Sequence, residues 1–535
     1  MLTCTAVIMD ILLSLPSLLL LFVISISSLL LFFVLLSQIW SKDLSSYPPG
    51  LEPYPFIGHL PQFLKNRHRI VDWQTECLAA SPTNTFVIFR TGGVGHVITA
   101  NPANVEHMLR SNSDNYIKGD RVISVLHDFL GDGIFSSDGD TWRVQRKTAS
   151  FEFNTKSLRS FVVRCVQQEV LHRLLPLLRR ASLDRSVVDL QDVLERFAFD
   201  NICKVAFNHD PACLAQDVEG GDARDNFSTG FAAAFIDASV ISSGRFRYAV
   251  HRFWMIKKLF GVGSERRLKE AIATVHNAAM QIIRSKKKER RASSSSSSSV
   301  PQAEDLLSRF VANEDHSEEF LRDIVINFML AGKDTTSSAL TWFFWLLSSR
   351  PEVEAKILDE IRSIRAQNPN GAAAAFDFEE LREMHYLQAA ITESMRLYPP
   401  VPFSSLTCLS DDVLPDGTAV KKGWFVSYTP YAMARMEAVW GVDCGEYKPE
   451  RWLEAGTGAF RPESPFKYPV FHGGPRMCLG KEMAYIQMKS VAACVLEKFA
   501  VEVSEKAASP EKMVSLTLRM EGGLPVLLRP RESRV

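Results

Sequence analysis

The segment from Ile11 to Ser41 contains no charged residue. A run of this length exceeds the roughly 20 apolar residues that an α-helix needs to cross a bilayer. A cleaved signal peptide is the alternative, but its apolar core spans only about 7–15 residues and ends at a small-residue cleavage site, and no such pattern ends this run. We therefore predict a transmembrane anchor over residues 11–41, with the rest of the chain folded on one side of a membrane.

The charges that flank this run predict its orientation. Asp10 precedes the run, whereas Lys42 and further basic residues up to Arg69 follow it. Because positive charge is retained on the cytoplasmic side of membranes, we predict a single-pass protein with most of its chain in the cytosol. Residues 42–56 are rich in proline, which stiffens a chain and resists helix formation, so they are predicted to form a hinge before a domain over residues 57–535.

The composition argues against several partners and frameworks. The chain has 61 Lys and Arg residues against 61 Asp and Glu residues, so its formal net charge is zero and no overall field would attract nucleic acid. Its nine cysteines are an odd number without a C-x-x-C pair, which argues against a disulfide framework or a zinc ribbon. The basic run 286–291 and the serines that follow are typical of a solvated surface loop.

Periodicity predicts a mostly helical fold with a smaller β part. Long segments repeat apolar residues at helical spacing, and shorter runs are typical of strands. A single domain of this size suggests a fold built around a large cofactor. The predicted helices are Ser157–Leu178, Asp189–Val205, Glu265–Arg284, Glu318–Ser349, Pro351–Ala366, Phe378–Leu397 and Gly480–Phe499, and the predicted strands are Thr85–Arg90, His96–Thr99 and Trp424–Tyr428.

A ten-residue stretch that ends at Gly480 carries the strongest chemical signal. Cys478 lies where an amphipathic helix begins, and the partial positive charge of a helix start favours the thiolate that binds iron. Arg476 supplies a cationic fork for a carboxylate such as a haem propionate, and Phe471 can cover the sulfur. Gly474 and Gly480 permit close approach of the metal plane.

The alternative is that Cys478 is one more small buried hydrophobe. However, the pattern F-x-x-G-x-R-x-C-x-G fixes five positions and is expected by chance in about one in ten thousand chains of this length. The stretch resembles the haem-binding loop of the cytochrome P450 family. This resemblance implies the family's haem-thiolate fold, with haem b held through an axial thiolate from Cys478.

Three further motifs in the same order strengthen the resemblance. Glu393 and Arg396 match the E-x-x-R of the family's K helix, and Arg451 lies in a P-E-R-W segment whose arginine completes a salt-bridged triad in that family. Trp142 and Arg146 match a W-x-x-x-R whose side chains reach a propionate. Alone, an E-x-x-R is more often a surface ion pair worth a few tenths of a kcal/mol, but the order and number of these motifs make the resemblance specific.

The resemblance is greatest to plant ω-hydroxylases of fatty acids and to their relatives that oxidise jasmonoyl-isoleucine. It is carried by residues 192–214, 411–418 and 468–489. One departure follows Pro399 and Pro400, where related sequences often carry an Asp or a basic residue and this chain has Val401–Leu406. Such relatives imply an endoplasmic reticulum protein whose catalytic domain is cytosolic.

The long helix from Glu318 carries one apolar stripe with a polar residue, Thr335, in it. Gly332 and Thr335 are one turn apart and are predicted to open a groove in the helix for dioxygen. A-G-K-D-T-T also matches the family's A/G-G-x-D/E-T-T/S, in which the acid and alcohol control proton delivery, so Asp334 and Thr335 are the predicted catalytic pair. The alternatives are a core threonine and a solvated aspartate. The predicted stripe comprises Ile324, Phe328, Ala331, Thr335, Ala339, Trp342 and Leu346.

A thiolate ligand favours O–O cleavage and hence an oxidant able to attack an unactivated C–H bond. Monooxygenation with O₂ is therefore the implied reaction. No nucleotide-binding motif follows a predicted strand, so the electrons must come from a partner, and the family implies an NADPH-dependent flavoprotein reductase. Some of six basic residues near the motifs are predicted to form the docking face for this reductase: Arg143, Arg146, Lys147, Arg476, Lys481 and Lys489.

The predicted substrate is a small lipophilic acid, with ω-hydroxylation of medium or long-chain fatty acids as the first hypothesis. Residues 227–235, Phe403 and Leu524 are predicted to border an apolar channel, which would bind alkyl chains by burial at about 0.8 kcal/mol per CH₂. A jasmonoyl-isoleucine 12-hydroxylase and a sterol side-chain hydroxylase remain alternatives. An electron-independent haem isomerase and a non-catalytic haem sensor are alternatives of a different class, and the Asp334–Thr335 pair argues against both.

Overall fold

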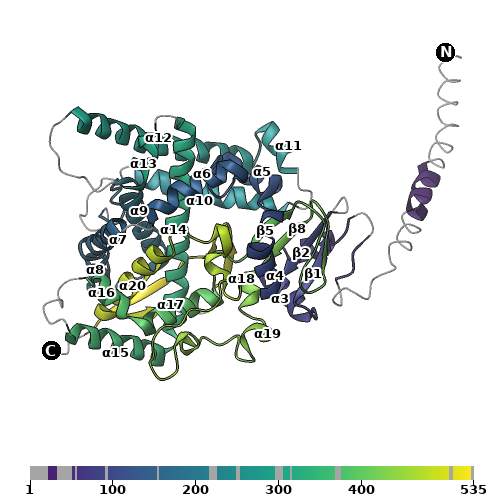
Figure 1. Cartoon of the computed structure of the whole chain (residues 1–535). Helices are drawn as coiled ribbons and strands as arrows, with labels where there is room; N and C mark the ends of the chain where they lie inside the picture. The colour runs from purple at the N-terminus through teal and green to yellow at the C-terminus, as the bar shows by residue number, and fades with distance from the viewer. Residues whose placement is uncertain are drawn as a thin grey trace, which may run out of the picture.

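The computed structural model describes residues 22–32, 51–54, 57–90, 94–153, 156–215, 226–248, 253–295, 305–313, 316–367, 375–504 and 510–531. Helices make up most of this part of the chain, as predicted (Figure 1). The α-helices are α2 (Leu60–Asn66), α3 (Ile70–Ala80), α4 (Pro102–Glu106), α5 (Gly119–Leu130), α6 (Gly139–Phe153), α7 (Lys156–Glu169), α8 (Leu175–Leu183), α9 (Leu190–Phe207), α10 (Asn226–Gly244), α11 (Phe253–Phe260), α12 (Ser264–Ser295), α13 (Leu306–Ala312), α14 (Glu318–Ser348), α15 (Pro351–Gln367), α16 (Phe378–Glu383), α17 (His385–Leu397), α18 (Pro430–Met433), α19 (Glu437–Trp440) and α20 (Lys481–Lys498).

Shorter helical turns join these elements. Two of them are π-helical, η2 (His107–Ser111) and η4 (Val170–Leu174). The 3₁₀ turns that matter for the site are η8 (Pro449–Trp452), η9 (Pro469–Phe471) and η10 (Gly474–Arg476).

The β part is a mixed five-stranded sheet with smaller sheets beside it. In the large sheet the order is β1-β2-β8-β5-β3, and only the β2–β8 pairing is parallel. A three-stranded sheet has the order β4-β12-β9, and β10–β11 and β6–β7 are antiparallel pairs. The strands are β1 (Thr85–Phe89), β2 (Gly95–Thr99), β3 (Tyr116–Ile117), β4 (Val188–Asp189), β5 (Ser404–Cys408), β6 (Asp412–Val413), β7 (Ala419–Val420), β8 (Phe425–Tyr428), β9 (Phe499–Val503), β10 (Lys512–Val514), β11 (Leu518–Met520) and β12 (Pro525–Pro530).

Helix α14 runs through the middle of the helical part and packs against α9, α12, α17 and α20 (Figure 1). Its start is capped by Ser317, whose hydroxyl accepts the backbone N–H of Phe320 at 3.1 Å. Gly332 is where α9 comes closest, because a Cβ at this position would collide with the side chain of Ile202. A glycine in the middle of α14 is therefore required by helix packing.

The C-terminal segment is tied into this same core. The backbone carbonyl of Leu518 in β11 accepts hydrogen bonds from the Ser338 hydroxyl at 2.6 Å and from the Trp342 indole at 3.0 Å. Both donors belong to α14 and are buried. The strand near the end of the chain is thus part of the surroundings of the central helix.

Most predicted helices and strands are confirmed within a few residues, but two helical segments differ from the prediction. The segment from Phe378 is split at Met384 into α16 and α17. The predicted helix over 157–178 is interrupted by the π-helical turn η4 and extends to Leu183.

The prediction of a solvated loop at residues 286–291 was wrong, because α12 continues through Ser295. Lys286 forms an ion pair with the buried carboxylate of Asp305, and Lys287 pairs with Glu318 at 3.1 Å. Lys, Glu and Arg are good helix formers, and these contacts hold the basic run against the N-cap of α13 and the first residue of α14.

Of the predicted anchor over residues 11–41, the structure describes only residues 22–32, which are helical and have exposed side chains. The remainder of the predicted anchor, and most of the predicted hinge over 42–56, lie outside the described residues. Among the residues that are described, no helix is both long and apolar enough to cross a membrane.

Candidate active site around Cys478

The loop before α20 presents Cys478 with its thiol accessible. The backbone N–H of Cys478 donates to the carbonyl of Phe471 at 2.8 Å, which closes the loop, and α20 begins three residues later. Cys478 is exposed, whereas the other cysteines that the structure describes are buried or half-buried. The loop therefore singles out this one sulfur for contact with a ligand.

The electrostatics of this thiol differ from the prediction based on the helix start. Burial by surrounding protein raises the pKa of the Cys478 thiol and outweighs the backbone N–H of Gly480 and the nearby Arg146 and Lys481, which favour the thiolate. A side chain that is both accessible and desolvated faces a recess rather than open solvent. Coordination of a metal ion would favour the thiolate against this effect of burial.

The predicted neighbours of the thiol shape the loop by specific contacts. The Phe471 ring packs against Tyr485 of α20, with 5.5 Å between ring centroids, and Lys481 lies 5.6 Å from the centroid of the same ring. Gly474 has a positive φ, and a Cβ there would collide with the carbonyl oxygen of Leu109. Approach of the η2 backbone is sufficient to require this glycine, and the predicted approach of a metal plane stays a prediction.

Arg476, Trp142 and Arg146 come together as predicted. The Arg476 guanidinium lies 4.3 Å from the centroid of the Trp142 ring and pairs with Asp138 at 2.6 Å. Arg146, on the same helix α6 as Trp142, donates to the carbonyl of Met477, the residue before Cys478. All five predicted cofactor-binding residues, Trp142, Arg146, Phe471, Arg476 and Cys478, thus surround or form one loop.

The structure adds Lys118 to this group, which the sequence analysis missed because no motif marks it. Burial lowers the pKa of Lys118 to about 8, with Arg476 adding repulsion, and burial also lowers the pKa values of Arg146 and Arg476. The same cations, after burial itself, lower the pKa of His472 to about 3.

Of these three cations, Arg476 pairs with the carboxylate of Asp138, which also accepts the backbone N–H groups of Lys118 and Gly119 at 3.0 and 2.8 Å. Partly buried positive charge with little matching negative charge is unfavourable unless an anion arrives. A haem carries two propionates, so Lys118, Arg146 and Arg476 beside an accessible thiol fit that group.

Helix α14 carries the predicted oxygen-activating residues. The predicted stripe is buried at Ile324, Phe328, Ala339, Trp342 and Leu346, whereas Ala331 and Thr335 in its middle are partly exposed. The Thr335 hydroxyl donates to the carbonyl of Ala331 at 2.6 Å, the predicted bond to the preceding turn. Within the predicted stripe, exposure is confined to this one turn, which indicates that a recess opens at Thr335.

Asp334 lies in a buried group of four charges that we name the Lys333 cluster: Glu195, Lys333, Asp334 and Arg519. Lys333 pairs with Asp334 at 2.6 Å and lies 3.6 Å from Glu195, which in turn pairs with Arg519 at 2.5 Å. The predicted alternative of a solvated aspartate is therefore wrong. The sequence analysis missed Glu195, Lys333 and Arg519, since the cluster joins three distant segments.

A second ionic group, the Glu393 cluster, consists of Glu393, Arg396 and Arg451 and confirms the predicted triad. Arg396 binds both oxygens of Glu393, at 2.7 and 2.9 Å, and Arg451 lies 3.3 Å away. The Trp452 indole and the backbone N–H of Lys448 complete the shell around the carboxylate. Glu393 and Arg396 are buried at 0 and 1% exposure.

Several other predicted residues lie elsewhere than expected. Phe231, Phe235 and Leu524 are buried in the core, so they do not border an open channel as predicted, whereas Phe403 is half-buried. Lys489, predicted for the docking face, is buried and donates to Gln388.

After Pro400, where relatives often carry an acid or a base, the chain forms β5. There Ser405 bonds Ser427 of β8 at 2.5 Å. The neighbouring Tyr428 hydroxyl shares a hydrogen bond with His472 of the cysteine loop. Hydroxyl side chains such as that of Ser405 are thus found in the segment where related sequences often carry a charged side chain.

Comparison with known proteins agrees with this geometry. Residues 48–524 match the family model described as Cytochrome P450. The chain is 51% identical over 476 residues to Cytochrome P450 CYP94D108 of Paris polyphylla, which covers 89% of this chain and 91% of that one. It is 44% identical to Cytochrome P450 94A1 of Vicia sativa, over 90% of both chains, and 45% identical to Cytochrome P450 94B1 of Arabidopsis thaliana, over 92% and 93%. The chain therefore belongs to the cytochrome P450 family of haem-thiolate monooxygenases.

Proposed function

We propose that this protein is a membrane-anchored monooxygenase that hydroxylates the ω-carbon of medium or long-chain fatty acids. The observation that carries the monooxygenase part is the accessible Cys478 thiol next to three partly buried cations, Lys118, Arg146 and Arg476, of which only Arg476 is paired with Asp138. The substrate rests on the resemblance to plant fatty-acid ω-hydroxylases, which is supported by identity of 43–51% to relatives of the 94 series.

Named residues would hold the cofactor. Cys478 would ligate the iron of haem b, and Lys118, Arg146, Arg476 and Trp142 would meet its carboxylates. When bound, the haem supplies the activation of O₂ for insertion into a C–H bond.

The residues of α14 would control protons. The Thr335 hydroxyl donates its hydrogen bond to the Ala331 carbonyl, so its oxygen is free to accept a hydrogen bond from a water in the recess. Asp334 is bound to Lys333 and would exchange that partner for a water when a proton is passed on. A terminal methyl is not chemically favoured over the neighbouring methylene. The walls of the site would therefore have to admit only the end of the alkyl chain.

The membrane location is supported by an apolar surface on and after α11 as well as by the predicted anchor. Leu259 is 82% exposed and Phe260 71%, while Phe253, Ile256 and Val262 are about half exposed. Lys257 and Lys258 lie in the same helix. Exposed aromatic and aliphatic side chains with lysines among them suit the boundary of an anionic bilayer.

Electrons would arrive from NADPH through a flavoprotein reductase. Three of the predicted docking residues, Arg143, Lys147 and Lys481, are exposed and suit an acidic partner surface. Arg476 is instead paired with Asp138 beneath the surface.

The test is product analysis by mass spectrometry. Full-length protein, reductase and NADPH are incubated with lauric acid, oleic acid, jasmonoyl-isoleucine and a sterol. We expect ω-hydroxylated fatty acids and no product without NADPH. Mainly in-chain hydroxylation, or turnover of the jasmonate or the sterol alone, would contradict the substrate, and turnover without NADPH would favour the isomerase.

A further inference from the structure

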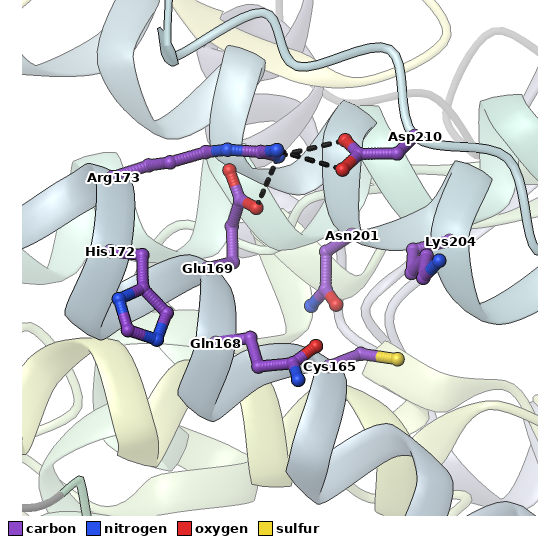
Figure 2. Close-up of a pocket in the computed structure, with 8 residues that line it drawn as sticks. All are labelled: Cys165, Gln168, Glu169, His172, Arg173, Asn201, Lys204 and Asp210. Atoms are coloured by element: carbon purple, nitrogen blue, oxygen red, sulfur yellow. Dashed lines mark hydrogen bonds and ion pairs between the residues drawn. The ribbon is translucent and has the colours of Figure 1, made fainter. Parts of the chain in front are cut away.

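A polar pocket of about 200 Å³ lies between α7, the π-helical turn η4, α9 and the segment that follows α9 (Figure 2). None of its lining residues belongs to the site around Cys478 or to either ionic cluster. The π turn places His172 and Arg173 at the pocket, next to Glu169 at the end of α7. Such turns occur frequently at functional sites.

Asn201 of α9 is the most unusual residue of this pocket. Its side chain is only 1% exposed, yet neither the nitrogen nor the oxygen of its amide has a hydrogen-bond partner among the residues that the structure describes. Figure 2 shows the Asn201 amide directed between the helices toward Gln168. An unpartnered buried amide costs about 1–3 kcal/mol unless something polar meets it.

One cation beside the pocket, Lys204, is not held in a close ion pair by any residue that the structure describes. Arg173 is neutralised by Asp210, with its two nitrogens 2.7 and 2.8 Å from the carboxylate, and it also binds Glu169 at 2.8 Å (Figure 2). Burial and the neighbouring Asp200 raise the pKa of Glu169 to about 8, so this carboxyl is mainly neutral at pH 7. Lys204 has no ion-pair partner within 4 Å in the described part of the chain.

We propose that this pocket binds a small oxyanion of the phosphate class. Lys204 supplies the charge, and the amide nitrogen of Asn201 and the imidazole of His172 supply further donors. One water takes up about 30 Å³ of liquid volume, so the pocket has room for a phosphate group and several waters. A bound anion would link η4 to α9, since its ligands come from both.

The test uses the full-length, haem-loaded protein. Calorimetric titration with sodium phosphate, against sodium chloride at the same ionic strength, measures saturable binding, and thermal unfolding measures the rise in Tm that binding to the folded state produces. Vesicles with and without phosphatidic acid form a second arm, which distinguishes a free phosphate from a lipid headgroup.

Two variants and a control define the site. We expect Lys204→Gln and Asn201→Leu to weaken binding at least tenfold, and Lys269→Gln, which removes an exposed lysine of α12, to leave it unchanged. If Asn201→Leu does not fold, loss of phosphate binding in Lys204→Gln alone is sufficient to support the site. Binding only to phosphatidic acid vesicles, lost in Lys204→Gln, identifies a headgroup. No saturable binding in either arm, or binding equal in wild type and Lys204→Gln, would overturn the proposal.

Discussion

The two buried ionic clusters use the same kinds of side chain in opposite ways. In the Glu393 cluster, each carboxylate oxygen accepts at least two hydrogen bonds, and the Arg396 guanidinium also donates to the carbonyls of Ala434, Cys444 and Glu446. In the Lys333 cluster, one ammonium is divided between two carboxylates, at 2.6 Å from Asp334 and 3.6 Å from Glu195. The first arrangement is saturated and the second is not.

This difference separates a structural role from a role in proton transfer. Burial raises the pKa of Glu195 even though Lys333 and Arg519 oppose the change, so this carboxyl lies closer to neutrality than an ordinary glutamate. A carboxyl group close to neutrality can gain or lose a proton and can change its ion-pair partner. The Glu393 cluster has no spare donor or acceptor with which to do so, and it can only hold α17 and η8 together.

The largest expected effect is the loss of folding in Glu393→Gln. The change leaves Arg396 buried without its counter-charge, which costs about 3–5 kcal/mol, a large fraction of the roughly 5–15 kcal/mol that stabilises a domain. We expect thermal unfolding far below that of the wild type and no Soret band of a haem-thiolate protein. The control is Glu450→Gln, which removes a half-exposed pair with Lys356 worth about 1 kcal/mol at most. Similar melting temperatures for the two variants would show that the Glu393 cluster is not structural.

The second prediction concerns Thr335→Ala and Asp334→Asn. Both should retain haem, but NADPH oxidation should yield hydrogen peroxide instead of hydroxylated product, with about a tenfold or greater fall in product per NADPH. Thr341→Ala is the matched control, because its hydroxyl makes the same bond to the preceding turn, at 2.8 Å, from a fully buried position. Unchanged coupling in both variants would remove them from proton delivery.

A smaller effect is expected for Glu195→Gln. Lys333 would then bind Asp334 alone, and the tighter pair should slow proton transfer about two- to fivefold, which corresponds to roughly 0.4–1 kcal/mol. The measurement is product per NADPH together with the solvent isotope effect, which a purely structural change would not alter. Glu502→Gln, which removes an exposed pair with Arg529, is the control. An isotope effect identical to that of the wild type would contradict the role of Glu195.

The last prediction concerns the pH dependence of stability rather than the two ionic clusters. The folded-state pKa of Glu169 is raised from an ordinary 4.5 to about 8, so between these values the folded protein binds a proton that the unfolded chain releases. Stability should therefore fall as the pH rises from about 4.5 to 8, by at most about 1.4 kcal/mol per unit, and flatten above 8. Chemical unfolding at pH 6, 7, 8 and 9 should show this slope in wild type, and Glu169→Gln should reduce it. A slope of equal size in the variant would assign the proton to another group.

Local patterns predicted the parts of the site that lie in one segment. Phe471, Arg476 and Cys478 are neighbours in sequence, and Trp142 and Arg146 share one turn of α6, so spacing alone could indicate them. The ionisation state of Cys478 could not be predicted in this way. Burial depends on everything that packs around the loop, and it reversed the direction expected from the helix start.

Several contacts between distant segments could not be predicted from the sequence. Lys118 meets Arg476 across more than 350 residues, and Glu195 reaches both Lys333 and Arg519. The predicted channel residues Phe231 and Phe235 failed for a related reason. Both rings pack against other aromatic side chains, Phe199 and Phe129, and an apolar segment looks the same in sequence whether it lines a channel or fills a core.

The hydrogen bonds to the Leu518 carbonyl also bear on the order in which the chain is made. Ser338 and Trp342 leave the ribosome well before residue 518, so their two donors stay without this partner until Leu518 has been made. Contacts that close such long loops form late and slowly. The helical part of the nascent chain therefore stays incompletely folded until Leu518 is made. A premature stop codon anywhere before Leu518 would remove this carbonyl and leave the helical part incompletely folded.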